Sequence, residues 1–391
     1  MPDESIALLS ASEMARLVRA RELSPVEVLE ACLERVERLN PTINAVVTLN
    51  PRARDEAAEL ERRIARGEDV GPLAGVPVGI KDVTQVGGLR CTFGSPLFSD
   101  HVPDEDAEVV RRFRASGAVI LGKTNTPEFA AGGNTFNEVF GRTHNPWNPE
   151  RSAGGSTGGG AAGLATGMIA LAEGTDLGGS LRIPASFCGV VGLRPSVGLV
   201  PTTPSDYLWD TLQVTGTIAR SAEDVALSLQ AVAGPSELAP LAQSIAGRDF
   251  VGAVRSADPR GLRIAYCPDI AGIGIDAQVE RVCREAALAL DGAGASVETI
   301  ELDLAYARPA FLALRGLWFV SMLHPHLDRL DRFGVNVANN LRAGLATTVE
   351  ELGAAEQARK RIRETFRDLF RRFDYLLTPT MAVPPFPVTE N

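Results

Sequence analysis

Short apolar segments alternate with longer amphipathic patterns along this chain, and that alternation limits the fold to a small group of architectures. The apolar segments have the length of buried strands and lie at residues 74–82, 118–123, 263–267, 296–302 and 374–378. The amphipathic patterns predict helices at residues 105–116, 221–233, 277–293, 307–324 and 348–373, and a segment rich in alanine and glycine predicts another at 159–167. Chains that alternate in this way form a mixed or mostly parallel sheet covered by helices. The sequence therefore predicts the α/β class.

Two further patterns divide the rest of the chain into helices and loops. The first 70 residues read as helices, and both Ser10-x-x-Glu13 and Ser24-Pro25-x-Glu27 fit a capped helix start. Residues 141–160 and 174–185 are rich in glycine and polar residues, which predicts two long loops.

Length and charge exclude several classes of protein. A chain of 391 residues suits one large or two medium domains, and length alone does not decide between them. The net charge of −10 argues against nucleic acid or an anionic membrane as the main partner. No apolar run approaches the roughly 18 residues of a membrane span, and the N-terminus does not resemble a signal peptide. Five cysteines without a CxxC pair predict reduced thiols, so we expect a cytoplasmic protein.

The sequence offers little for metal or phosphate chemistry. Only four histidines occur, and His324-Pro325-His326 is more typical of a surface turn than of a ligand pair. Residues 154–160 are glycine-rich, but no Lys-Ser/Thr pair follows them as in a phosphate-binding loop. We expect no metal and no cofactor.

Each predicted loop contains a serine that could act as a nucleophile. Ser156 lies in a formal GxSxG motif, which would make it the nucleophile of an α/β-hydrolase. That motif needs a hydrophobic strand directly before it, and residues 149–153 are too polar for one. In the second loop, Gly178 and Gly179 allow backbone N–H groups to converge as an oxyanion hole requires, and Ser180 follows them. This loop alone fits a tight turn equally well.

Three motifs in order resemble the amidase signature family, serine hydrolases with a Ser–cis-Ser–Lys triad. The motifs lie at residues 75–82, 154–159 and 174–195, and residues 122–125 and 145–147 also fit. The spacing of 24 between Ser156 and Ser180 matches the family pattern. The resemblance implies a single domain over residues 1–391, with a C-terminal end shorter than is usual for the family. It also implies a large mixed β-sheet flanked by helices on both faces.

The resemblance implies a role for each matching residue. Ser180 would be the nucleophile that carries the acyl group, Ser156 the bridging serine after a cis peptide bond, and Lys81 the base. The further implied residues are the oxyanion-hole amides of Leu177, Gly178, Gly179 and Ser180, the carbonyl of Ala130 on the leaving-group side, and the supporting residues Thr157 and Arg182.

The proposed base is one of very few lysines. Of 39 basic residues only three are lysine, namely Lys81, Lys123 and Lys360. A lysine base must be neutral, so its ordinary pKa of about 10.4 must fall by several units, which burial without a carboxylate partner would achieve. Arginine could not serve, because it keeps its proton. We expect Lys123 to be a strand-end charge and Lys360 a helix-surface charge.

Several polar residues are expected to support the site. Thr157 stands where a second serine is usual, and its hydroxyl should keep the hydrogen-bond network intact. Leu177 contributes only its backbone, and Arg194 replaces a usual lysine and should be structural. Asp82 and Asp176 are expected to hold their loops by accepting backbone N–H bonds.

The expected reaction is hydrolysis of a carboxamide, with esters and carbamates also open. The expected partners are a small-molecule amide and water, without nucleic acid or membrane, and a homodimer is left open. Ile183 stands where the A subunit of glutamyl-tRNA amidotransferase tends to carry Gln, which favours a stand-alone amidase over that glutaminase. The remaining alternative is a catalytically silent binding protein.

Overall fold

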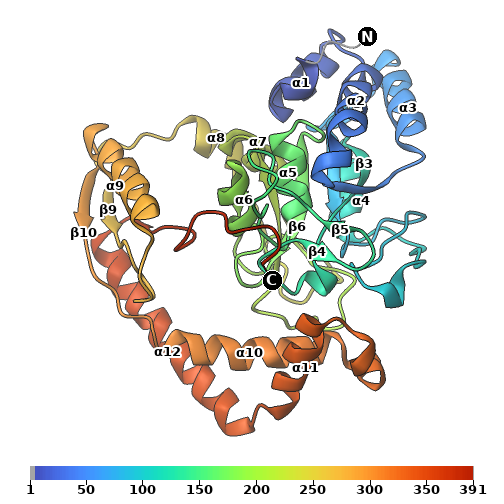
Figure 1. Ribbon diagram of the computed structural model, residues 1–391. Coiled ribbons are helices and arrows are strands. Elements are labelled where there is room, and N and C mark those ends of the chain that lie inside the picture. The colour runs from blue at the N-terminus through green and yellow to red at the C-terminus, as the bar shows by residue number, and fades with distance from the viewer. Residues whose placement is uncertain (1–4, 391) are drawn as a thin grey trace. The chain divides into compact units, whose positions relative to one another are not determined.

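The computed structural model describes residues 5–390, which form two compact units (Figure 1). Unit 1 comprises residues 5–255, 332–336 and 385–390, and unit 2 comprises residues 256–331 and 337–384. The single domain expected over residues 1–391 remains a prediction, because the division into two compact units does not test it.

Unit 1 is built on a six-stranded mixed sheet in the order β1-β3-β2-β6-β8-β7. Strand β2 is parallel to β3 and β6, whereas the outer pairs are antiparallel. The strands are β1 Val46–Leu49, β2 Pro77–Lys81, β3 Val119–Thr124, β6 Leu171–Asp176, β7 Val191–Leu193 and β8 Val214–Ala219. Every residue of β2, β3, β6 and β8 is buried. Because side chains alternate between the two faces of a sheet, both faces of this one are covered.

Helices surround this sheet in Figure 1, which confirms the predicted α/β class with a mixed sheet flanked by helices. A separate small hairpin pairs β4 Phe136–Asn137 with β5 Gly141–Arg142. The helices of unit 1 are η1 Ile6–Leu8, α1 Ala11–Arg19, α2 Pro25–Ile43, α3 Ala53–Ala65, η2 Pro96–Phe98, α4 Glu108–Ala115, η3 Glu128–Ala130, α5 Gly158–Ala165, α6 Arg182–Cys188, α7 Ala222–Val232 and α8 Phe250–Arg255.

The local signals in the first 70 residues predict most of their structure. Ser10 accepts a hydrogen bond from the Glu13 amide, and Ser24 forms a complete capping box with Glu27, so both predicted helix starts are confirmed. The prediction of helices throughout this region is wrong at β1. Its sequence Val-Val-Thr-Leu is dominated by β-branched residues, which favour a strand once a neighbouring strand is present to pair with it.

Helix α5 lies directly against the sheet because its residues are small. Its sequence is Gly-Gly-Gly-Ala-Ala-Gly-Leu-Ala, and all but the last residue are buried. A Cβ atom at Gly159 would lie 2.3 Å from the Asn125 nitrogen and 2.6 Å from the Ala45 oxygen. Glycine is therefore required there, and it lets the N-terminus of α5 approach the ends of the central strands.

Unit 2 contains a three-stranded parallel sheet in the order β10-β9-β11. Each strand and helix predicted between residues 263 and 378 is present, and α11 is an additional helix that the sequence did not predict. The elements are β9 Arg263–Tyr266, α9 Ala277–Gly292, β10 Ser296–Thr299, α10 Ala307–Met322, η4 His324–Arg332, α11 Val335–Ala346, α12 Val349–Arg372 and β11 Tyr375–Leu377, of which η4 and α11 cross a unit boundary. Among residues 5–390, no helix is both long and apolar enough to cross a bilayer.

The second glycine-rich loop is shorter than predicted. Strand β6 continues through Asp176 and α6 begins at Arg182, so only residues 177–181 remain as a loop. Strand β6 pairs along its whole length with β8, which the sequence did not predict. Strand β6 contains polar residues, so its sequence does not form the apolar segment that is typical of a buried strand. Pairing with β8 holds these residues in an extended conformation.

Candidate functional site

Three segments that are distant in sequence meet at one edge of the six-stranded sheet. Strands β2 and β6 are parallel neighbours, with Gly79 opposite Ala172, so both strands end at this edge. Lys81 is the last residue of β2, and residues 177–181 follow the end of β6. The third segment, residues 154–157, leads into α5, and its Thr157 amide donates a hydrogen bond of 3.2 Å to the carbonyl of Ser180. The carboxyl ends of parallel strands are the usual location of α/β active sites.

Lys81 lies fully buried between two hydroxyl groups. Its Nζ atom donates hydrogen bonds to Oγ of Ser156 at 2.6 Å and to Oγ1 of Thr175 at 3.0 Å. Burial lowers the pKa of the Lys81 amine to about 7, while the negative charges of Glu173 and Asp176 act in the opposite direction. A substantial fraction of this amine is therefore neutral near pH 7, as a base requires.

The segment around Ser156 is packed without spare space. The peptide bond between Gly155 and Ser156 is cis, as the family resemblance implies. A Cβ atom at Gly155 would lie 2.8 Å from the carbonyl oxygen of Gly132, so no larger residue fits. Ser156 is fully buried, and its hydroxyl faces the Lys81 amine.

Thr157 does not support the site in the way the sequence suggested. Its hydroxyl is buried and has no hydrogen-bond partner within residues 5–390, so it does not extend the network around Lys81. Its backbone amide joins the two loops instead, through the bond to Ser180 described above. The hydroxyl that does contact the Lys81 amine belongs to Thr175.

Ser180 is half-buried at the end of a loop that Asp176 organises. The Asp176 carboxylate accepts hydrogen bonds from the amides of Gly179 at 2.8 Å and Leu181 at 3.1 Å. The Gly179 amide is thus occupied, although the resemblance implied that it belongs to the oxyanion hole. The amides of Leu177, Gly178 and Ser180 have no acceptor in the described part of the chain. Gly179 has a φ of +112°, which an L-residue rarely adopts.

Two arginines hold Asp176 in place. Arg182 donates to both carboxylate oxygens, at 3.0 and 2.9 Å. Arg194 lies 3.3 Å from the carboxylate, donates to the Asp176 carbonyl and donates to the Leu212 carbonyl at 2.7 Å. Burial raises the pKa of Asp176, but these hydrogen bonds outweigh it and hold the pKa at about 2. Asp176 is therefore ionised at every pH at which the protein would work.

We expect Asp176→Asn to reduce kcat by about 10- to 100-fold, because removing a single oxyanion-hole donor costs roughly 100- to 1000-fold and this change misplaces donors without removing them. The unfolding free energy should fall by about 2 kcal/mol through loss of charge-assisted bonds. Steady-state kinetics and thermal unfolding measure both effects. Asp258→Asn is the matched control, since Asp258 forms a similar bidentate pair with Arg260 on the surface of unit 2. Equal losses in both variants would contradict an organising role for Asp176.

The residues around Ala130 have an unusual backbone. Phe129 and Ala130 have φ values of +46° and +59°, in a region that non-glycine residues seldom adopt and that often marks functional sites. The carbonyl of Ala130 accepts a hydrogen bond of 3.1 Å from Gly132. The Phe129 ring stacks on Phe93 at 5.5 Å and meets Phe333 edge to face at 5.6 Å. An aromatic cluster therefore adjoins the residue that the resemblance places on the leaving-group side.

Two residues of β6 that contact Lys81 were not predicted from the sequence. Glu173 is fully buried and accepts the backbone N–H of Lys81 at 3.1 Å, and Thr175 contacts the Lys81 amine. The Glu173 carboxyl group thus lies near Lys81 through the backbone N–H, without forming an ion pair with the amine. Thr175 lies in the predicted loop and Glu173 just before it, whereas their spacing of two would place both on one face of a strand.

The other two lysines differ from each other. Lys360 is exposed on α12, as predicted. Lys123, predicted as a strand-end charge, is fully buried in β3, where it lies 3.8 Å from Asp82 and donates to the Thr84 carbonyl. Asp82 accepts the Thr92 amide at 3.1 Å and so holds its loop as expected.

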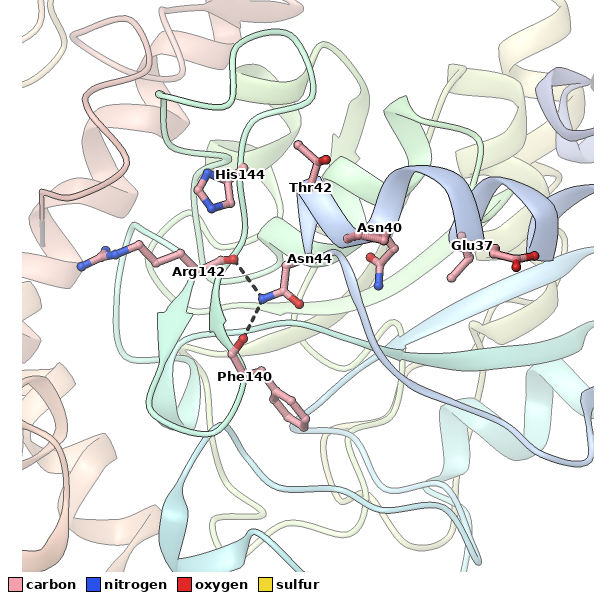
Figure 2. A pocket seen from close by; sticks show the side chains of 9 residues that line it. Glu37, Asn40, Thr42, Asn44, Phe140, Arg142 and His144 are labelled. Carbon is pink, nitrogen blue, oxygen red and sulfur yellow. Dashed lines mark hydrogen bonds between the residues drawn. The ribbon is translucent and has the colours of Figure 1, made fainter.

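The described residues contain no candidate metal centre, and the Cys188 thiol is not activated. No group of three or more potential metal ligands occurs among residues 5–390. Cys188 is buried, and burial raises the pKa of its thiol far above the usual range. A cavity of about 490 Å³ at the C-terminal end of α2 is shown in Figure 2, where Asn44 donates to the carbonyls of Phe140 and Arg142 at 2.7 and 3.0 Å. None of the predicted site residues lines this cavity.

Comparison with known proteins identifies relatives along the whole chain. The model of the Amidase family matches residues 27–391. An acylamidase from Rhodococcus erythropolis is 37% identical over 400 residues, which cover 100% of this chain and 82% of the relative. The A subunit of the glutamyl-tRNA(Gln) amidotransferase from Carboxydothermus hydrogenoformans is 36% identical, with 98% of this chain and 84% of the relative covered. The crystal structure of a bacterial aryl acylamidase of the amidase signature family superimposes with a TM-score of 0.89 at 30% identity, covering 97% of this chain and 81% of that one.

Proposed function

This chain belongs to the amidase signature family, and on that basis we propose that it hydrolyses carboxamides through an acyl-enzyme formed on Ser180. The observation that carries the proposal is the contact of 2.6 Å between Nζ of Lys81 and Oγ of Ser156. A fully buried amine with a pKa lowered to about 7 is a suitable base, and it has no other evident use in this position.

In the proposed reaction, one proton passes from Ser180 through Ser156 to Lys81 and later returns along the same path. Oγ of Ser180 attacks the acyl carbon while its proton passes to Ser156, whose own proton passes to the Lys81 amine. The free amides of Leu177, Gly178 and Ser180 hold the negative charge on the tetrahedral oxygen. The proton then returns through Ser156 to the leaving nitrogen, and the C–N bond breaks. Water hydrolyses the resulting ester of Ser180 by the same route, with Lys81 again as the base.

We infer that N-acyl amides with an aromatic amine are the most suitable first substrates. Two relatives are named acylamidase or aryl acylamidase, and their similarity covers nearly the whole chain. The cluster of Phe93, Phe129 and Phe333 beside Ala130 offers rings against which an aromatic leaving group can pack. An N-acylated nitroaniline is a convenient probe, because its product absorbs visible light.

A second candidate function is that of the glutaminase component of an amidotransferase. The 36% identity to the A subunit of the amidotransferase, over 98% of this chain, favours it. Ile183, in place of the Gln that is typical there, argues against it. Glutamine hydrolysis that depends on added partner proteins would support this candidate, whereas anilide hydrolysis by the isolated chain would exclude it as the main activity.

We expect a fluorophosphonate probe to label this chain at Ser180, because a serine that adds to an acyl carbon also displaces fluoride from phosphorus. Peptide mapping by mass spectrometry locates the label. Labelling should be absent in Ser180→Ala and slowed by roughly 100- to 10,000-fold in Lys81→Ala, the usual range for loss of a general base.

The matched control for this experiment is Ser186→Ala, because Ser186 is an exposed serine six residues away on α6. It should be labelled like the unmodified chain. A label on Ser156 would instead support an α/β-hydrolase mechanism, and the absence of any label would contradict the proposed acyl-enzyme.

A further inference from the structure

Five charged side chains are fully buried where β2, β3 and β6 end. They are Lys81, Asp82, Lys123, Glu173 and Asp176, each with 0% of its surface exposed. Burying a charge is costly unless a partner or hydrogen bonds compensate for it. Lys123 and Asp82 lie 3.8 Å apart and form an ion pair. Asp176 is bound by Arg182 and Arg194. Lys81 and Glu173 remain, and the proposed mechanism uses only Lys81.

Glu173 is held in one position by two hydrogen-bond donors. One carboxyl oxygen accepts the backbone N–H of Lys81 at 3.1 Å, and the other accepts the Thr84 hydroxyl at 2.9 Å. Glu173 and Thr175 are two residues apart on β6 and so lie on the same face of the strand, and Thr175 contacts the Lys81 amine at 3.0 Å. The carboxyl group of Glu173 is therefore fixed near the amine but forms no ion pair with it within 4 Å in the described residues.

The other charges near Lys81 have partners of their own. Asp82 is paired with Lys123, and Asp176 is bound by Arg182 and Arg194. Burial raises the pKa of Glu173, whereas the Thr84 hydroxyl and the positive charges of Lys81 and Lys123 act in the opposite direction and favour its ionised form. Among the carboxylates that surround Lys81, Glu173 is thus the one without a cation in contact with it anywhere in residues 5–390.

We propose that Glu173 is a positioning residue that sets the basicity of the Lys81 amine. The proposal rests on the function of Lys81 as the base, put forward above. Its carboxylate field partly offsets the effect of burial and keeps the amine basic enough to accept a proton from serine. Without that field, burial alone can lower a lysine pKa to about 5 or 6. Such an amine is neutral at pH 7 but is a weak base, and the efficiency of general-base catalysis falls with the basicity of the catalyst.

The direct test is the titration of the Lys81 side chain by NMR. With only three lysines in the chain, lysine labelled with ¹³C at the ε position gives three side-chain signals. The spectrum of Lys360→Arg assigns the exposed residue, and that of Lys81→Arg assigns Lys81. In Glu173→Gln we expect the Lys81 titration midpoint to move down by about one to two pH units, the size expected for loss of one charge a few ångströms away at an effective dielectric constant near 20. The acid limb of the kcat/KM profile should move by the same amount.

Two variants control for general effects of the substitution. Glu108→Gln changes another nearly buried glutamate that is bound to Arg112, and it should leave the Lys81 titration unchanged. Glu173→Asp keeps the charge and should restore most of the midpoint. If Glu173→Gln does not fold by circular dichroism, Thr84→Val replaces it. Loss of the Thr84 hydroxyl raises the pKa of Glu173, so the Lys81 midpoint should also move down.

The NMR result is independent of the proposed function. An unchanged or raised Lys81 midpoint in Glu173→Gln overturns the proposal, even if the enzyme is active. A lowered midpoint in a chain that is not labelled at Ser180 would instead support the electrostatic coupling and contradict the acyl-enzyme.

Discussion

Replacement of Ser180 by alanine should lower kcat/KM for an N-acylated nitroaniline by at least about 10,000-fold. The expected loss is large because covalent catalysis depends on one oxygen atom, and nucleophile deletions in serine hydrolases cost up to roughly a millionfold. Initial-rate kinetics measure the loss. The stability should change little, since Ser180 is half-buried and its hydroxyl does not bond to Ser156 in the described residues.

Ser156→Ala is the informative comparison for this variant. It removes the proposed proton relay but keeps the nucleophile, so we expect a loss of roughly 100- to 10,000-fold and residual labelling at Ser180. A double variant should be no slower than Ser180→Ala alone, because residues that act as a unit are not additive. Full activity in Ser180→Ala, with the loss confined to Ser156→Ala, would reverse the two assignments.

Replacement of Lys81 by arginine should reduce kcat/KM by roughly 1,000- to 10,000-fold. Arginine keeps a positive charge and a long side chain, but it stays protonated at any accessible pH and cannot accept a proton from Ser156. Its larger head group must also fit a site where Lys81 is fully buried. Steady-state kinetics and thermal unfolding distinguish loss of the base from loss of the fold.

Lys360→Arg makes the same substitution at a lysine whose side chain is 68% exposed, and it should leave both quantities unchanged. Retention of more than about a tenth of the activity in Lys81→Arg would exclude Lys81 as the general base, because removal of such a base costs at least about 100-fold.

The dependence of kcat/KM on pH in the unmodified chain follows from the titration of the Lys81 amine. Because the pKa of Lys81 is lowered to about 7, its amine is protonated below that pH and cannot act as a base, so kcat/KM should rise with pH and level off above about 7. The contribution of Lys81 to the free energy of unfolding also rises with pH. The unfolded chain binds the Lys81 proton up to its ordinary value of 10.5, so this group's unfavourable contribution decreases as pH rises from 7 to 10.5.

The parts of the structure that depend on local signals could be predicted from the sequence. Ser24 and Glu27 define a helix start by themselves, and the apolar segment that ends at Lys81 is recognisable as a strand. The three motifs also indicated which residues belong together, since Lys81, Ser156 and Ser180 do converge at one sheet edge. Strands β1 and β8 were missed because pairing with their neighbours, more than their own composition, makes them strands.

The details of the site depend on packing that the sequence does not display. The Thr157 hydroxyl was expected to hold the network, yet Thr175 does so because strand geometry turns it toward Lys81. The Gly179 amide was expected in the oxyanion hole, yet the nearby Asp176 carboxylate is a stronger acceptor and takes it. Lys123 was expected only as a strand-end charge, and its burial beside Asp82 depends on the pairing of β2 with β3.

The burial of two of the three lysines has a practical consequence for conjugation chemistry. Reagents that acylate primary amines, such as succinimidyl esters, react with exposed neutral amines and cannot reach Lys81 or Lys123. Among the side chains of residues 5–390, Lys360 on α12 is left as the single accessible amine. A dye, a surface or a carrier can therefore be attached at one side chain in unit 2, with the α-amino group as the competing amine. The same chemistry on most proteins of this size gives a mixture of products.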